Sequence, residues 1–169
     1  MKNTIPEVIN QYGDNIARKV NRKRIGCRGI IIDGDNILIS YETNTQMYMT
    51  PGGGLENDET YTECCKREIL EETGFITDVG EHFLIINEYY LDWLYETHYF
   101  VCTIRGTGEQ RLTQNEIEHG TAPRWLPINE FINIVSKFEE YKSTDPERCG
   151  QYRRENAAIL YYNSHKNKE

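Results

Sequence analysis

The sequence lacks the features that would place it in a membrane or in an oxidising compartment. No run approaches the roughly 20 apolar residues that a membrane helix needs. The first residues, MKNTIPEVINQYGDNIARKV, lack the apolar core of a signal peptide. The five cysteines are odd in number and show no CxxC spacing, which argues against a disulfide framework and against a zinc site. We therefore expect reduced thiols and a cytoplasmic location.

Positive charge is also scarce. The chain carries 19 Lys and Arg against 27 Asp and Glu, a formal net charge of -8. That balance argues against broad nucleic-acid affinity through the whole surface. It still allows an anionic small-molecule substrate, because a divalent metal can lie between acidic side chains and phosphates. With 169 residues and 38% hydrophobic content, the chain is long enough for one domain, residues 1–169, with its own core.

The secondary-structure pattern alternates between β-branched or aromatic runs and amphipathic runs. The predicted strands are 24–33, 37–42, 46–50, 75–91 and 97–106. DGDN between the first two is a hairpin signal, and residues 92–96 are expected at a second hairpin tip. The predicted helices, apart from one within 51–75, are 6–20, 126–138 and about 151–162. Strands around one central helix indicate an α/β (α+β) fold.

The stretch PGGGLENDETYTECCKREILEETGF, residues 51–75, holds most of the chemistry. Seven acidic residues lie between Glu56 and Glu72. A helix advances about 100° per residue, so Glu68, Glu71 and Glu72 are expected to share one face. Like charges at these spacings destabilise a bare helix by about 0.2–0.5 kcal/mol per pair. A hard divalent cation would reverse that sign, because Mg²⁺ and Mn²⁺ prefer carboxylate and carbonyl oxygens.

A solvated acidic helix is the alternative interpretation, since most charge runs are no more than that. Two details weigh against it: the upstream glycines let a loop fold close against the helix, and the acids lack lysines at i+4. We expect Asp58 to cap the start of this helix and Gly74 to end it in a left-handed conformation.

The spacing in this stretch matches a known motif at every specified position. Gly53, five residues, Glu59, seven residues and then REILEETGF, residues 67–75, follow the pattern G-x5-E-x7-R-E-U-x-E-E-x-G-U, where U is aliphatic or aromatic. This is the Nudix box, and the chain therefore resembles the Nudix hydrolases (the MutT-like superfamily). Weaker resemblance extends over about residues 24–138. It implies a mixed β-sheet sandwiched between helices, with a loop–helix–loop box at 53–75 and helices flanking the core at both ends.

The resemblance implies Mg²⁺- or Mn²⁺-dependent cleavage of the diphosphate in a nucleoside diphosphate joined to another moiety. Candidate substrates are nucleoside triphosphates, nucleotide sugars such as ADP-ribose, dinucleoside polyphosphates and capped RNA ends. The alternative is a non-catalytic nucleotide-binding regulator with a Nudix fold. Such relatives usually lose box glutamates, whereas this chain has all of them. Two further hypotheses are nucleic-acid contact through the basic run 18–28, which the net acidity opposes, and a homodimer through the hairpin 84–103.

The resemblance also assigns roles within the box. It implies that Glu68, Glu71 and Glu72 bind the metal, together with a backbone carbonyl at Gly52 or Gly53. The other fixed positions are interpreted as structural: Glu59 and Arg67 as an ion pair, and Gly74 as the end of the helix.

The motif leaves the general base open, because family members differ in which glutamate serves. Glu71 is our first choice within the box, with Glu68 beside it. Outside the box, Glu116 and Glu118 are candidates in a predicted loop before the strand that contains Trp125; the alternative is that both are merely exposed acids.

Substrate contacts are predicted outside the box. Arg24 or Arg28 is expected to reach the phosphates, because the acidic box alone would repel them; a solvated basic flank is the alternative. Arg153 and Arg154 are weaker candidates for the same role. Tyr48 stands where many relatives have tryptophan and is a candidate to stack on a base. Other aromatic candidates, each more readily explained as scaffold, are Tyr89, Tyr90, Trp93, Tyr95 and Tyr99.

Overall fold

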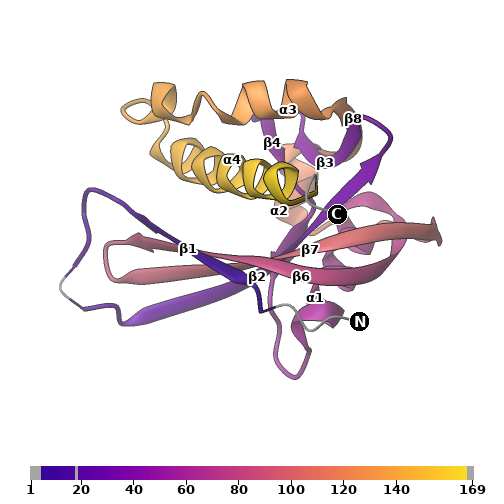
Figure 1. The fold of residues 1–169 in the computed structure, drawn as a ribbon, viewed down its shortest axis with the longest axis horizontal. Helices are drawn as coiled ribbons and strands as arrows, with labels where there is room; N and C mark the ends of the chain where they lie inside the picture. Colours follow the sequence, from indigo (N-terminus) through magenta and orange to yellow (C-terminus); the bar gives the residue numbers. More distant parts are fainter. Residues whose placement is uncertain (1–4, 18, 167–169) are drawn as a thin grey trace.

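The computed structural model describes residues 5–17 and 19–166, which form one mixed β-sheet with helices on both faces (Figure 1). The strand order is β1-β6-β7-β2-β3-β4, with β5 paired to β2 and β8 paired to β3. The strands are β1 (Glu7–Tyr12), β2 (Arg22–Asp33), β3 (Asn36–Glu42), β4 (Met47–Met49), β5 (Gly52–Gly54), β6 (Phe75–Tyr90), β7 (Trp93–Thr107) and β8 (Thr121–Pro127). The helices are α1 (Tyr61–Thr73), α2 (Gln114–His119), α3 (Ile128–Val135), the 3₁₀ helix η1 (Phe138–Tyr141) and α4 (Pro146–Lys166). The predicted α+β class is confirmed.

The long hairpin of β6 and β7 is the centre of the sheet, and the N-terminal half of the chain pairs along both of its sides. β1 lies parallel to β6, and β2 lies parallel to β7 from Arg22 opposite Trp93 to Ile31 opposite Cys102. The hairpin turn is tighter than the predicted 92–96, because Trp93 already pairs with Tyr90. These pairings bring the basic run beside the aromatic end of the hairpin, except Arg18, which lies outside the described residues.

The predicted helix at residues 6–20 is wrong, because residues 7–12 form β1. Along this strand Ile9 and Gln11 turn inward while their neighbours are exposed, which is the period of two that a strand requires. The edge of β6 supplies hydrogen-bond partners for this backbone, so tertiary pairing overrides the local pattern. At the other end, α4 is longer than the predicted 151–162, and α3 is shorter than the predicted 126–138.

Two hydrophobic cores lie on opposite faces of the sheet, because side chains alternate along each strand. One core fills the space between the sheet and the pair α3 and α4, which lie together on one face in Figure 1. The other lies beneath α1, where Cys64, Cys65 and Ile69 pack on Phe100 and Cys102. All five cysteines are free thiols. Among the described residues, no helix is both long enough and apolar enough to cross a membrane.

The packing of α4 can be tested at two neighbouring positions. Ile159 is fully buried in the core beneath α4, whereas Leu160 is 48% exposed. Ile159→Ala is expected to lower the free energy of unfolding by about 2–5 kcal/mol, because it leaves a cavity. Leu160→Ala is expected to change it by less than about 0.5 kcal/mol. Urea unfolding followed by circular dichroism measures both, and equal effects would contradict the described packing of α4.

Candidate active site

The box helix α1 is fixed at both ends by backbone caps. Thr60 is the N-cap: its Oγ1 accepts from the Glu63 amide at 3.2 Å, and the Glu63 carboxylate accepts from the Thr60 amide at 2.7 Å. This reciprocal capping box begins the helix two residues after Asp58, so the predicted Asp58 cap is wrong. Asp58 instead adopts a left-handed φ of 68° in the preceding turn. Gly74 ends the helix with a φ of 73°, as predicted.

Arg67 ties the box loop to the box helix. Its Nε and Nη2 donate to the two carboxylate oxygens of Glu59 at 3.0 and 2.7 Å, and Nη2 also donates to the Gly54 carbonyl at 3.0 Å. The expected ion pair between Glu59 and Arg67 is therefore present. These hydrogen bonds lower the pKa of Glu59 to about 2. The remaining nitrogen, Nη1, contacts Glu68 at 2.8 Å and Glu71 at 3.1 Å.

Two of the box glutamates are buried against the glycine strand β5. Glu72 accepts from the Gly52 amide at 2.9 Å, and burial raises the pKa of Glu72 to about 8. Burial also raises the pKa of Glu68. A Cβ atom at Gly53 would lie 2.3 Å from Glu68 Oε2, so the loop passes too close to the helix for any side chain there.

A third carboxylate joins these two from outside the box. Ligand oxygens of Glu68, Glu72 and Glu116 all lie within 4.8 Å of one another. Glu71 is not part of this group; it turns toward Arg67 and is about one third exposed. The expected single face of three box glutamates is thus divided: Glu68 and Glu72 lie in the cluster, whereas Glu71 lies outside it. Arg67 contacts both Glu68 and Glu71.

Glu116 is positioned by a short helix rather than by the predicted loop. Thr113 caps α2, and the Glu116 carboxylate accepts from the Thr113 amide at 2.6 Å in a second capping box. Glu118, the other outside candidate, is bonded to Gln114 at 2.9 Å and is exposed. The sequence signal that could have separated the two is the Thr-x-x-Glu spacing of Thr113 and Glu116.

The donor set fits a hard divalent cation. Three carboxylates converge and two of them are buried, an arrangement that like-charge repulsion and desolvation oppose unless positive charge is supplied. Mg²⁺ and Mn²⁺ favour oxygen ligands of this kind. Glu68, Glu72 and Glu116 are therefore the residues able to hold such an ion.

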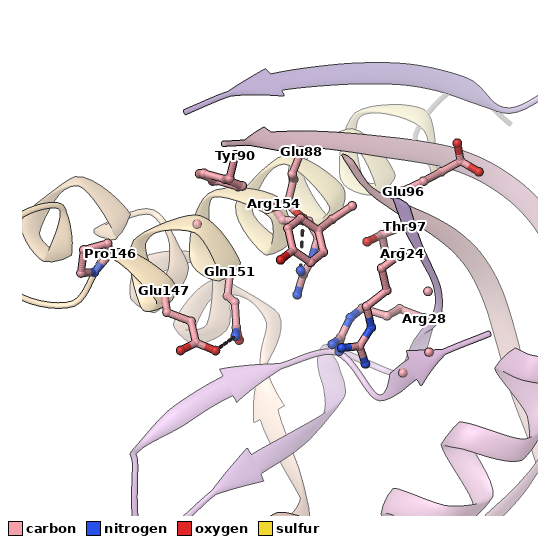
Figure 2. A pocket seen from close by; sticks show the side chains of 15 residues that line it. Arg24, Arg28, Glu88, Tyr90, Glu96, Thr97, Pro146, Glu147, Gln151 and Arg154 are labelled. Carbon is pink, nitrogen blue, oxygen red and sulfur yellow. Dashed lines mark hydrogen bonds and ion pairs between the residues drawn. The ribbon is translucent and has the colours of Figure 1, made fainter. Parts of the chain in front are cut away.

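A cavity of about 540 Å³ opens beside the box glycines. Arg24 and Arg28 of β2 line it together with Gly53 and Gly54, as Figure 2 shows for the two arginines. The two predicted phosphate contacts therefore lie next to the box. The opposite wall comes from α4 and from the aromatic end of the hairpin, including Tyr90 and Tyr95.

Tyr48, the third predicted substrate contact, is placed elsewhere. It lies in β4, half-buried against the core beneath α4, with its ring centroid 4.7 Å from that of Tyr41. It does not line the cavity beside the box. The aromatic residues that do, Tyr90 and Tyr95, belong to the hairpin set.

A buried ion network joins α4 to the loop that enters the box. Arg154 contacts Glu88 at 3.2 Å and Glu155 at 3.3 Å. Glu155, which is fully buried, accepts from the amide and hydroxyl of Thr50 at 3.1 and 2.7 Å. Arg28 lies 3.8 Å from Glu155 and donates to the Thr50 carbonyl.

This network gives Arg154 two carboxylate partners, so the weaker prediction of a phosphate contact does not describe its main contacts. The other arginine of that prediction, Arg153, donates to the Tyr12 carbonyl at 3.0 Å. Sequence reasoning missed Glu88 and Glu155, because nothing local marks an acid whose partner lies many residues away on another element.

A model of the Nudix domain matches residues 22–146, more than half of the chain. The chain belongs to the Nudix family. The prediction of an enzyme acting on phosphoric anhydride bonds is thereby confirmed at the level of the family. The match starts after β1 and ends at Pro146, the first residue of α4, so β1 and the rest of α4 lie outside it.

Solved Nudix structures share the fold at low sequence identity. A Nudix hydrolase from Nitrosomonas europaea aligns with a TM-score of 0.57 at 20% identity, over 79% of this chain and 89% of its own. A MutT Nudix hydrolase from Burkholderia pseudomallei aligns with a TM-score of 0.52 at 19% identity, over 64% and 86%. A UDP-X diphosphatase aligns with a TM-score of 0.52 at 20% identity, over 63% and 52%.

The clamp between Glu59 and Arg67 predicts a pH-dependent contribution to stability. Because the pKa of Glu59 is about 2 in the folded protein and near 4.5 when unfolded, the stabilisation is complete above pH 4.5 and is lost as pH falls toward 2. Glu59→Gln is expected to cost about 1–2 kcal/mol of unfolding free energy at pH 7. The difference from the unsubstituted protein should shrink below pH 4.5.

Urea unfolding at several pH values between 7 and 3 measures this difference. Glu56→Gln is the matched control, because Glu56 is 71% exposed and lies 3.8 Å from Arg67. It should have little effect at any pH. A Glu59→Gln cost that stayed constant down to pH 3 would show that charge on Glu59 is not what holds the loop.

Proposed function

We propose that this Nudix protein is a Mg²⁺- or Mn²⁺-dependent pyrophosphohydrolase. Its substrate is a nucleoside diphosphate linked to another moiety, either a nucleoside triphosphate or a nucleotide sugar such as ADP-ribose. The observation that carries the proposal is the adjacency of two opposite charges around β5. The carboxylate cluster of Glu68, Glu72 and Glu116 lies on one side of the glycine strand, and Arg24 and Arg28 line the cavity on the other.

The chain's own residues divide the work of binding a diphosphate. Glu68, Glu72 and Glu116 hold the cation, which when bound supplies neutralisation of phosphate charge and activation of water. Arg24 and Arg28 bind phosphate oxygens, a task for which the planar guanidinium is well suited. The absence of side chains at Gly53 and Gly54 lets phosphates approach the backbone between these groups.

Glu71 is the first candidate for the general base. It is about one third exposed, so water reaches it, and it lies outside the three-carboxylate cluster. A positioned carboxylate that accepts a proton typically contributes about 10²–10⁴ in rate. Arg67, 3.1 Å away, holds the carboxylate in place. Glu116 is the second candidate, and Glu118 faces away on an exposed turn of α2.

The related folds support a nucleotide substrate of this general class. One of them is named as a UDP-X diphosphatase and another as a MutT Nudix hydrolase. Those names describe those proteins. For this chain they are consistent with a small-molecule nucleotide partner whose identity is decided by residues outside the box.

Turnover tests the proposal directly. A panel of ADP-ribose, UDP-glucose, dinucleoside polyphosphates and nucleoside triphosphates is incubated with Mg²⁺ or Mn²⁺, and phosphate, pyrophosphate and nucleotide products are quantified. We expect one substrate class to be hydrolysed, with loss on removal of the metal by chelation. Glu71→Gln should lower kcat by about 10²–10⁴, whereas Glu118→Gln should not. Tight nucleotide binding without turnover across the panel would favour the regulator instead.

Metal binding tests the ligand set independently of turnover. Glu72→Gln and Glu116→Gln are each expected to weaken Mn²⁺ binding by about tenfold or more, since each removes one of three carboxylates. Electron paramagnetic resonance of free Mn²⁺ measures the change. Glu118→Gln is the matched control on the same helix as Glu116 and should leave the affinity as it is. Unchanged affinity in Glu116→Gln would remove that residue from the site.

A further inference from the structure

The cavity beside the box has two chemically different ends. At one end lie the guanidinium groups of Arg24 and Arg28 and the box glycines. At the other, Glu147 and Gln151 project from α4, as Figure 2 shows, with Tyr90 nearby. The arginine end suits phosphate. The α4 end is therefore left for the part of a substrate that lies beyond its phosphates.

Gln151 presents an unused acceptor at that end. Its Nε2 donates to Glu147 Oε1 at 3.2 Å. A carboxylate can only accept, so this bond directs the NH₂ group toward Glu147 and leaves the amide oxygen on the other side. That oxygen, Oε1, is buried and has no hydrogen-bond partner among the described residues. Buried acceptors normally have partners, and an unpaired one is costly, so a donor from a ligand would satisfy this oxygen.

The two neighbouring carboxylates of the cavity are already engaged. Glu88 is paired with Arg154, and Glu96 is paired with Lys23 at 2.8 Å and bonded to His98 at 3.0 Å. Among these acidic and amide groups, the Gln151 oxygen is the one that has no partner at all.

Flat aromatic side chains, Tyr90 and Tyr95, line the same cavity as Gln151. The rings of Tyr90 and Tyr95 meet edge to face with centroids 6.5 Å apart, and Trp93 stacks on Tyr95 at 5.4 Å. A Cβ atom at Gly150 would lie 2.8 Å from the Tyr90 hydroxyl, so Tyr90 packs directly on the backbone of α4. Rigid aromatic surfaces in the same cavity as one directed acceptor suit a planar heterocycle that carries an N–H donor.

We propose that Gln151 is a specificity-determining residue that selects a nucleobase with an exocyclic amino group: adenine, cytosine or guanine. The amino group donates to Gln151 Oε1, the ring lies beside Tyr90 and Tyr95, and the phosphates extend toward Arg24 and Arg28. The orientation of the phosphates rests on the proposed function. Gln151 of α4 would then select the base. This residue lies beyond residues 22–146, the range that the family model matches.

Binding of monophosphates tests the proposal without relying on hydrolysis. Isothermal titration compares three pairs: AMP with purine riboside monophosphate, CMP with pyrimidin-2-one riboside monophosphate, and GMP with IMP. The second member of each pair lacks only the amino group. We expect the amino form of at least one pair to bind about tenfold more tightly. Gln151→Met, which keeps length and removes the acceptor, should bring that ratio to about one.

Leu160→Met on the exposed face of α4 is the matched control and should keep the preference. Equal binding within all three pairs, a preference that persists in Gln151→Met, or no binding of any of the six would each overturn the proposal. Turnover is scored separately. A base preference without hydrolysis would contradict the proposed enzyme activity and support the role of Gln151. Hydrolysis without a base preference would support the enzyme activity and contradict the role of Gln151.

Discussion

The guanidinium of Arg67 is the contact on which the acidic site depends. It spans from Glu59 and the Gly54 carbonyl in the loop to Glu68 and Glu71 on the helix. Without this guanidinium, the acidic loop and the acidic face of the helix would repel each other. A lysine would not replace it, since a single ammonium lacks the rigid fork that bonds several acceptors at fixed positions.

A second arginine, Arg154, also links carboxylates from different elements, on the opposite face of the sheet. Arg154 is buried between Glu88 and Glu155, and Glu155 in turn holds Thr50, two residues before the glycine strand β5. Breaking a buried pair of this kind leaves an uncompensated charge, which is strongly destabilising. The box loop is therefore held from both faces, by Arg67 from α1 and by Glu155 from α4. Its glycines can lie close to acids and arginines because these two clamps prevent it from moving away.

The distribution of charge explains how an acidic protein can serve an anionic substrate. The net charge of -8 would repel a diphosphate at long range. Locally, Arg24 and Arg28 line the cavity, while the clustered carboxylates are arranged for a cation. Both charges meet across a strand of three glycines, which adds no bulk between them. The proposed function depends on this adjacency more than on the overall charge.

The sequence by itself determined the box, because its residues act within one helix and one adjoining loop. The family, the pair of Glu59 and Arg67 and the end at Gly74 all follow from fixed offsets over a few turns. Only the tertiary structure decided which outside acid joins the cluster and that Tyr48 packs against the core instead of lining the cavity. It also decided that residues 7–12 form a strand and that α4 closes the cavity with Gln151. These contacts join residues far apart in the chain, and local periodicity carries no information about which distant element a side chain will meet.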